Sequence, residues 1–137
     1  MDGALLLDTC ALIYAVEDTM SKSGAARITE AVRAGFALFV SPITAWEMGI
    51  LMARGRYTSP VTPHKWFEDA LAKPGVALAA MTPDVLIASS FLPGEPPSDP
   101  VDRILAATAR NLGLTLVTRD KPLLRYASAG HIDAVGC

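Results

Sequence analysis

Four short apolar runs, separated by segments with helical spacing, constrain this chain more than any other feature of its sequence. The runs cover Ala4–Leu7, Phe36–Val40, Gly75–Ala80 and Leu114–Val117. Continuous apolar runs of this length are typical of strands that are buried on both faces of a parallel sheet. Alternation of such strands with helices predicts an α/β protein that has helices on both faces of a mainly parallel sheet.

The segments between the runs predict helices, and several carry signals for helix ends. Ser23–Ala34 has apolar residues at helical spacing and is followed by Gly35, a residue type that commonly ends helices. Ser41-Pro42 provides an N-cap and a first-turn proline for a helix over Ile43–Ala53. Five further helices are expected over Ala11–Val16, His64–Ala72, Thr82 to about Phe91, Asp102–Leu112 and Lys121–Tyr126. An edge strand is expected over Ile132–Val135.

Length and composition limit the class of protein. A chain of 137 residues suffices for one domain with a real core, so we expect a single domain over residues 1–137. The net charge of −2 excludes a global positive field, so binding of a polyanion has to be local or mediated by a metal ion. No uncharged apolar run approaches the roughly 18 residues of a membrane span, and the two cysteines lack metal-ligand spacing. We therefore expect a reduced, cytoplasmic protein without a membrane partner.

Acidic residues follow two of the predicted strands and begin the helix that leads into the last one. Asp8 comes directly after the first strand, and Asp120 lies just beyond the fourth. Asp99 and Asp102 stand at the start of the intervening helix, and Glu47 lies on the helix after the second strand. Ligands of parallel sheets bind at the carboxyl ends of the strands. If the first and fourth strands are neighbours, these carboxylates share one edge of the sheet.

A cluster of carboxylates cannot remain fully ionised at close range without protons or cations to compensate it. Hard divalent ions such as Mg²⁺ and Mn²⁺ prefer oxygen ligands. Ions held on acids serve phosphoryl transfer, because they activate water and neutralise the phosphate. A shared metal site is therefore our preferred interpretation of these acids.

Taken singly, most of the acids also have a structural explanation. Acids at helix N-termini commonly act as caps, and three positions qualify: Asp99, Asp102 and Asp120. Glu47 alone is compatible with a partly exposed helix residue. Asp8 is the hardest to explain structurally, because apolar residues enclose it on both sides.

Four segments, taken in order, resemble the PIN-domain ribonucleases and more closely the VapC-type toxins of bacterial toxin–antitoxin pairs. They are LLLDTCAL, SPITAWEMGIL, PPSDPVDRILAATA and LTLVTRD, and the resemblance spans about residues 4 to 126. It implies a PIN-like three-layer α/β/α sandwich with a mainly parallel central sheet. It also implies Mg²⁺-dependent cleavage of RNA phosphodiester bonds, with Mn²⁺ as a substitute ion. The implied partners are RNA, a second copy in a homodimer and a small antitoxin.

The resemblance assigns roles to individual positions. The acids that it makes catalytic and metal-binding are Asp8, Glu47, Asp102 and Asp120, with Asp99 as a further ligand. The first three would hold the principal ion, and the fourth would support it or a second ion. Thr9 and Thr118 match small hydroxyl residues beside the site. Family members often have a histidine just before the DP segment, where this chain has Pro97-Ser98 instead, so no basic helper is expected there.

Five residues are candidates for contacts with RNA. Arg54, Arg56 and Tyr57 form a small basic and aromatic cluster beyond the Glu47 helix, which suits phosphate contacts and base stacking. The alternative is an ordinary solvated helix end. Arg103 and Arg119 are placed either to contact phosphate or to pair with the site acids.

Apolar side chains outside the strands are expected to be covered. Trp46, Trp66 and Phe67 are expected to pack in the core or at a dimer interface. Cys10 is expected to be a small buried residue.

Other classes of protein remain as alternatives. A PIN-like module that binds RNA or a protein without catalysis would keep the same fold, although the presence of all the site acids argues against it. A haloacid-dehalogenase-like phosphatase needs a second acid two residues after the first aspartate, where Cys10 stands. A response-regulator receiver needs an acid pair at the first strand and an aspartate at the end of the third, and this chain has neither.

Overall fold

The computed structural model of the protein describes residues 3–137, and within them five strands form one parallel sheet. The strands are β1 Leu5–Leu7, β2 Leu38–Val40, β3 Val76–Leu78, β4 Thr115–Thr118 and β5 Asp133–Gly136. The helices are α1 Thr9–Glu17, α2 Lys22–Arg33, α3 Pro42–Ala53, α4 Pro63–Leu71, α5 Pro83–Ala88, α6 Pro100–Leu112 and α7 Lys121–Ser128. No helix in this part of the chain is long and apolar enough to cross a membrane.

The predicted α/β architecture is confirmed, and the differences lie at helix ends. Every apolar run forms a strand, and the expected edge strand is β5. α6 begins at Pro100 rather than Asp102, because Asp99 is its N-cap and proline fits the first turn. α5 ends at Ala88, well before Phe91, so that prediction was too long.

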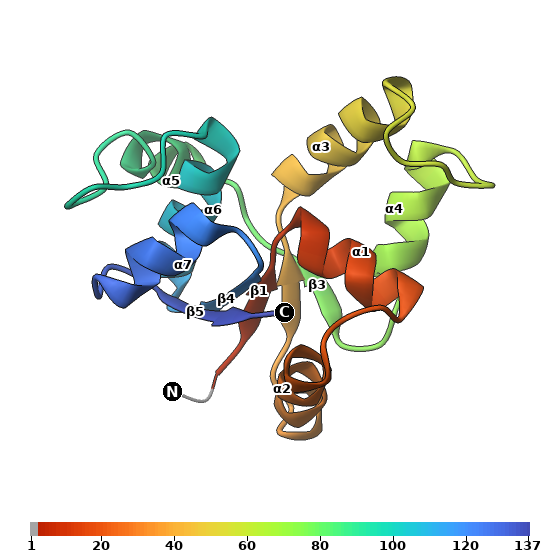
Figure 1. The fold of residues 1–137 in the computed structure, drawn as a ribbon, viewed down its shortest axis with the longest axis horizontal. Helices are drawn as coiled ribbons and strands as arrows, with labels where there is room; N and C mark the ends of the chain where they lie inside the picture. Colours follow the sequence, from red (N-terminus) through yellow and green to blue (C-terminus); the bar gives the residue numbers. More distant parts are fainter. Residues whose placement is uncertain (1–2) are drawn as a thin grey trace.

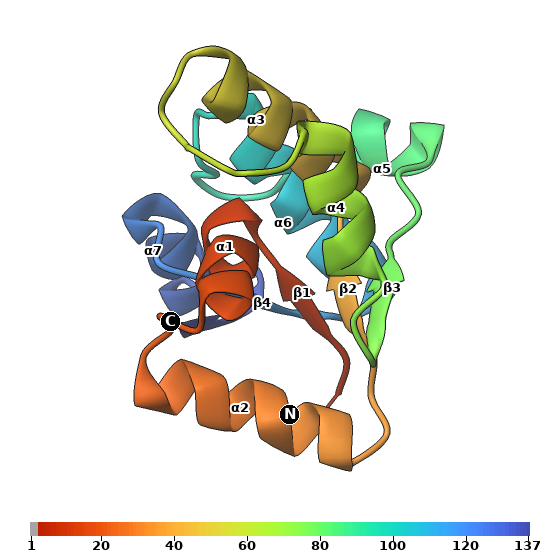
Figure 2. The ribbon, with the colours of Figure 1, turned by 90° about the vertical axis from the view of Figure 1, so that its right-hand side faces the viewer.

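The two faces of the sheet carry separate layers of helices. Leu5 and Leu7 point into a core cluster formed with α1, α2, α3 and α4, whereas Leu6 points into a second cluster formed with α6 and α7. This alternation is the normal geometry of a strand. All three leucines are almost fully buried. Figure 1 shows α6 and α7 on one side of the central strands and α3 and α4 on the other, and Figure 2 shows α2 below the strands and α3 above them.

The topology changes direction between β1 and β4. The strand order is β3-β2-β1-β4-β5, so the chain builds outward from β1 on one side and then crosses to the other. Leu7 is in register with Val117, which places the carboxyl ends of β1 and β4 side by side. Ligands of open parallel sheets bind at such a switch point. The expected site therefore has a defined place in the fold.

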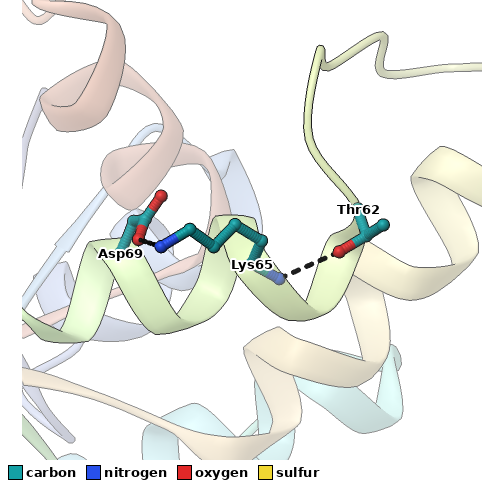
Figure 3. Close-up of polar contacts among 3 residues, drawn as sticks. All are labelled: Thr62, Lys65 and Asp69. Carbon is teal, nitrogen blue, oxygen red and sulfur yellow. Dashed lines mark hydrogen bonds and ion pairs between the residues drawn. The ribbon is translucent and has the colours of Figure 1, made fainter.

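The helix α4 illustrates how the surface helices are stabilised. Thr62 Oγ1 accepts a hydrogen bond from Lys65 N at 3.2 Å, and Lys65 Nζ lies 2.8 Å from Asp69 Oδ1 (Figure 3). An N-cap of this kind contributes about 1 kcal/mol, whereas an exposed ion pair of this kind contributes little. The charge of Lys65 therefore already has a partner within its own helix.

The expectation for the aromatic residues holds only in part. Trp66 is buried, and Phe67 packs against the same cluster, as predicted. Trp46 is 58% exposed and so lies outside the core, which leaves the predicted dimer interface as a prediction. The buried residues of α3 are Thr44 and Met48, four positions apart, and Trp46 lies between them on the opposite face.

Candidate active site

A pocket of about 320 Å³ opens at the carboxyl ends of β1 and β4. It brings together every acid that the sequence predicted for the site: Asp8, Glu47, Asp99, Asp102 and Asp120. The other lining residues are Thr9, Cys10, Leu105 and Arg119. We call this hollow the acid pocket.

Asp8 is the most buried of the five acids, with 6% of its surface exposed. Its Oδ1 accepts a hydrogen bond from Ala11 N at 2.7 Å and so caps α1, while Oδ2 accepts one from Thr118 Oγ1 at 2.5 Å. Burial raises the pKa of Asp8 to about 6, although both hydrogen bonds act to lower it. The charges of Glu47 and Asp120 raise the pKa further. The capping role explains how the chain accommodates this acid, and sequence reasoning had missed it.

Thr118 connects β4 to two of the acids. Its buried hydroxyl donates to Asp8 and accepts a hydrogen bond from Asp120 N at 3.0 Å. Asp120 Oδ2 in turn accepts from Leu123 N at 3.0 Å, which caps α7. The capping interpretation of Asp120 is therefore confirmed, and it occupies one of the two carboxylate oxygens.

Asp99 and Asp102 enter the acid pocket from the start of α6. Asp99 Oδ1 accepts hydrogen bonds from Val101 N at 2.8 Å and from Asp102 N at 3.2 Å, so this acid is the cap. Asp102 is one turn further on and half-buried. Burial raises its pKa to about 7, and the charges of the other four acids add to the rise.

Glu47 reaches the acid pocket from α3 and is held there by Thr9. The Thr9 hydroxyl donates to Glu47 Oε1 and lies 3.1 Å from Thr44 Oγ1. Burial raises the pKa of Glu47, the Thr9 bond opposes this rise, and the charge of Asp99 adds to it. Sequence reasoning missed Thr44, although its position three residues before Glu47 places both on one side of a helix.

Three helices begin at the acid pocket, each with one of the acids as its N-cap. Asp8 caps α1, Asp99 caps α6 and Asp120 caps α7. The free N–H groups and the dipole at a helix N-terminus favour negative charge by about 0.3–1 kcal/mol. This explains how five acids can gather in one place. Their burial and mutual repulsion still raise the pKa values of Asp8 and Asp102, so the pocket favours a cation.

The donor set suits a hard, hydrated divalent ion. Apart from the Cys10 thiol, the ionisable ligand groups of the pocket are all carboxylates. Within residues 3–137, no group of three or more His, Cys, Asp and Glu side chains is close enough together to hold a metal ion by protein ligands alone. Mg²⁺ keeps several of its waters and takes one or two carboxylates directly, whereas Ca²⁺ takes six to eight oxygens. An open wall of acids therefore fits Mg²⁺ or an ion like it better than Ca²⁺.

The two arginines predicted beside the site differ in their surroundings. Arg119 lines the acid pocket, and its guanidinium lies 5.0 Å from the centre of the Tyr14 ring. Arg103 donates from Nε to Ser89 O at 2.9 Å and from Nη1 to Pro97 O at 3.0 Å. Arg103 therefore braces the loop before α6, a structural role that neither predicted alternative included.

The predicted cluster beyond α3 lies outside the lining of the acid pocket. Arg54 and Arg56 are exposed. Tyr57 packs edge-on against Trp66 with ring centres 6.0 Å apart, and its hydroxyl donates to Glu17 Oε2 at 3.0 Å. This packing argues against Tyr57 as a platform for base stacking.

The prediction that Cys10 is buried was wrong. Cys10 is exposed and lines the acid pocket. Ala11 and Leu12 take the inner face of α1, which leaves the preceding side chain on the open side. Its position two residues after Asp8 is the signal that could have placed it at the site.

The fold and the acid pocket together define a PIN-type α/β protein, and comparison with known proteins agrees. Residues 5–129 match the model of the PIN domain. Because this match covers most of the chain, the protein belongs to the PIN-domain family. Ribonuclease VapC22 of Mycobacterium tuberculosis (strain ATCC 25618 / H37Rv) is 30% identical over 95 residues, which are 69% of this chain and 72% of that protein.

Solved structures share the fold at low sequence identity. VapBC2 from Rickettsia felis bound to a DNA fragment from their promoter gives a TM-score of 0.69 at 13% identity and covers 97% of this chain and 98% of that chain. FitAcB from Neisseria gonorrhoeae gives 0.56 at 16% identity, with 95% of each chain covered. FitAB bound to the IR36 DNA fragment gives 0.52 at 17% identity, with 96% and 94% covered. The predicted PIN-like sandwich is confirmed.

Proposed function

We propose that the protein is a metal-dependent endoribonuclease and the toxin of a toxin–antitoxin pair, inhibited by a small antitoxin. The observation that carries the proposal is the convergence of five carboxylates at the β1/β4 switch point of a PIN-family chain. The relative in Mycobacterium tuberculosis is named as a ribonuclease, which supports the reaction class. The VapBC2 neighbour supports a partner of this kind.

In this proposal the acids of the pocket hold Mg²⁺ or Mn²⁺. Asp8, Glu47 and Asp102 are the principal ligands, Asp120 supports the same ion or a second one, and Asp99 lies beside them. When bound, the ion neutralises charge on the scissile phosphate and lowers the pKa of the attacking water.

The surrounding residues orient these acids before substrate arrives. Thr118 donates to Asp8, and Thr9 donates to Glu47, so two carboxylates are held by hydroxyl groups. Arg119 places a cation at the pocket, where it would contact the RNA phosphate. Such preorganisation matters because residues behind metal ligands change activity by about 10- to 100-fold.

The direct test incubates purified protein, free of any partner, with structured and unstructured RNAs in Mg²⁺, in Mn²⁺ and in chelator. The wild type should cleave with either ion and fail with chelator. Asp8→Asn should reduce the rate by more than about 100-fold, because it alters a ligand itself. The matched control is Asp84→Asn, which changes an exposed acid on α5 and should retain activity.

Two outcomes would overturn the proposal in different ways. Equal cleavage by Asp8→Asn would exclude the acid pocket as the catalytic site. RNA binding without cleavage in both ions would instead support the inactive PIN-like module.

The proposal also includes a homodimer in the cytoplasm. Trp46, Ile87 and Phe91 are 58%, 61% and 80% exposed, and they offer apolar area on α3 and around α5 for a second copy. Light scattering should give twice the mass of the chain, and Trp46→Ala should shift the protein toward monomer. A monomeric wild type at micromolar concentration would remove the dimer from the proposal. A small open reading frame directly upstream would be the first candidate for the antitoxin, and co-expression with its product should give a complex that no longer cleaves RNA. Cell fractionation should find the protein in the cytoplasm.

A further inference from the structure

A second hollow, of about 370 Å³, lies between α7 and the loop that leads into α6. We call it the α7 groove. The lining residues that matter below are Glu95, Pro97, Pro122, Arg125, Tyr126 and His131.

The α7 groove adjoins the acid pocket along two stretches of chain. Pro97 of the groove is two residues before Asp99 of the pocket, and Pro122 is two residues after Asp120. Consecutive Cα atoms are 3.8 Å apart, so each of these pairs is separated by at most about 7 Å. An RNA strand that leaves the acid pocket between Asp99 and Asp120 would therefore pass directly into the α7 groove.

Two cations stand on the α7 side of this path. Lys121 and Arg125 are four residues apart on one face of α7, and both are exposed. Arg125 lines the α7 groove, and Lys121 directly follows Asp120, which lines the acid pocket and caps α7. Within residues 3–137, neither cation takes part in an ion pair, whereas Lys65 is paired with Asp69 (Figure 3).

The polar groups of the groove suit a nucleotide better than a simple anion. Arg125 offers donors for a phosphate, and the Glu95 carboxylate can accept a hydrogen bond from a base amino group. The rings of Pro97 and Pro122 offer apolar surface to a sugar or base.

The side chains of Tyr126 and His131, which form the floor of the α7 groove, are held by contacts within the protein. Tyr126 is 2% exposed, and its hydroxyl donates to Pro93 O at 2.5 Å. The His131 ring lies against the Tyr126 ring with centres 4.8 Å apart. A preformed site loses less entropy when it binds a ligand.

We propose that the α7 groove binds the nucleotide next to the cleaved bond, and that Lys121 and Arg125 contact its phosphate. The inference rests on the proposed ribonuclease function and deepens it by assigning the path of the RNA. The acids of the pocket repel RNA, so cations outside the pocket have to add to the attraction of Arg119 and of a bound metal ion. Arg125 lines the α7 groove, and Lys121 lies one helical turn closer to the acid pocket.

The test compares two double variants that remove the same number of charges. One is Lys121→Gln with Arg125→Gln, and the control is Lys22→Gln with Arg33→Gln, two exposed cations of α2 that line neither hollow. A labelled single-stranded oligoribonucleotide is titrated onto each at several salt concentrations, in an Asp8→Asn background that prevents cleavage. Cleavage is measured separately without the Asp8 change, and circular dichroism and thermal unfolding check that both variants fold.

The α7 variant should lose two phosphate contacts. Each contact to a single strand contributes roughly 0.7 to the slope of log affinity against log salt, so the slope should fall by about 1.4. At 0.1 M salt this corresponds to about 25-fold weaker binding. The KM for cleavage should rise by a similar factor while kcat changes less than about twofold, because the contacts bind ground state and transition state alike. The control should match its parent.

A third variant tests whether a base occupies the groove. Glu95→Gln should change the base preference at one position beside the cut when the ends of a cleaved RNA pool are sequenced. An unchanged preference would overturn the assignment of a nucleotide to the α7 groove.

The remaining outcomes separate this inference from the proposed function. If the wild type cleaves RNA and the α7 variant binds and cleaves like it, the groove assignment fails and the ribonuclease stands. If the control loses as much affinity, binding is general electrostatics and the assignment also fails. If the α7 variant loses antitoxin but keeps RNA, the groove is a protein surface and the inference is wrong. If the wild type does not cleave at all, the proposed function fails, and the binding titration still decides the groove.

Discussion

Replacing Asp8 with asparagine separates the cost of its buried charge from its contribution as a helix cap. Asp8 is 6% exposed, and burial raises its pKa from 3.8 to about 6. One pKa unit is worth about 1.4 kcal/mol, so an ionised Asp8 costs the folded protein about 3 kcal/mol at neutral pH. Asparagine removes the charge and keeps the size, and its Oδ1 can still accept from Ala11 N.

The hydrogen bond from Thr118 offsets part of this gain. Thr118 Oγ1 donates to Asp8 Oδ2 and already accepts from Asp120 N. The asparagine amide would place a second donor opposite this hydroxyl, which would then have to turn away. A lost hydrogen bond of this kind costs about 1–2 kcal/mol. We therefore expect Asp8→Asn to be about 1–2 kcal/mol more stable than the wild type at pH 7.5 without metal.

The pH dependence identifies the source of the difference. The folded pKa lies above the unfolded one, so the folded state holds the proton more tightly. The stability linked to protonated Asp8 is fully present below pH 3.8 and is lost as the pH rises through about 6. The advantage of the variant should therefore vanish or reverse at pH 4 and be complete at pH 7.5.

Urea unfolding in chelator at these two pH values measures the effect. The control is Asp84→Asn, an exposed acid whose change should shift the free energy of unfolding by less than about 0.5 kcal/mol. An Asp8→Asn variant less stable than the wild type at pH 7.5 would refute the reasoning, because the charge would then stabilise the fold.

Three further predictions concern other parts of the molecule. The pKa of Asp102 is raised to about 7, and a protonated carboxyl group does not bind metal. The affinity for Mg²⁺, measured by thermal shift, should therefore increase between pH 6 and pH 8. Equal affinity at the two pH values would contradict the metal-binding role of Asp102. Arg103→Gln removes the charge from two hydrogen bonds to backbone carbonyls and should lower the free energy of unfolding in urea by about 2–3 kcal/mol. Arg103→Lys should restore part of this loss. An unchanged unfolding midpoint would show that Arg103 does not stabilise the loop before α6. Gly94 and Gly55 have similar positive φ angles of 68° and 67°, but a Cβ added at Gly94 would lie 2.3 Å from His131 Nε2, whereas one added at Gly55 would meet no atom within 4 Å. Gly94→Ala should therefore be more destabilising than the control Gly55→Ala by about 1–3 kcal/mol in urea unfolding. Equal losses would mean that His131 moves aside freely.

Four of the five acids could be located from the sequence because each follows a strand or begins a helix, whereas Glu47 lies in the middle of α3 and was placed by the resemblance. What sequence reasoning left open was whether Asp99 and Asp120 were caps or site residues. The structure shows that each does both, since one oxygen caps a helix while the side chain lines the acid pocket. The two interpretations were never exclusive, because a carboxylate has two oxygens.

The misplaced residues share a physical cause. Cys10 was assigned to the interior by residue type, and Trp46 to the interior or to a dimer interface, yet both lie on the outer face of a helix. Arg103 was expected to contact phosphate or to pair with a site acid because it lies close to acids in the sequence. In the structure its guanidinium donates hydrogen bonds to two backbone carbonyls instead. Which face a helix presents, and which loop folds back on it, depends on packing partners that are distant in the chain.

The sequence by itself determined the local features of this protein. Continuous apolar runs specify strands buried on both faces, and serine, threonine, aspartate and proline specify where helices begin. These signals act between neighbouring residues and therefore survive without knowledge of the fold. Only the tertiary structure decided that β4 lies beside β1, that Thr118 bonds to Asp8 across 110 positions, and that the α7 groove adjoins the acid pocket. Burial and charge repulsion depend on distances through space, so the raised pKa values of Asp8 and Asp102 arise only when these distant segments meet.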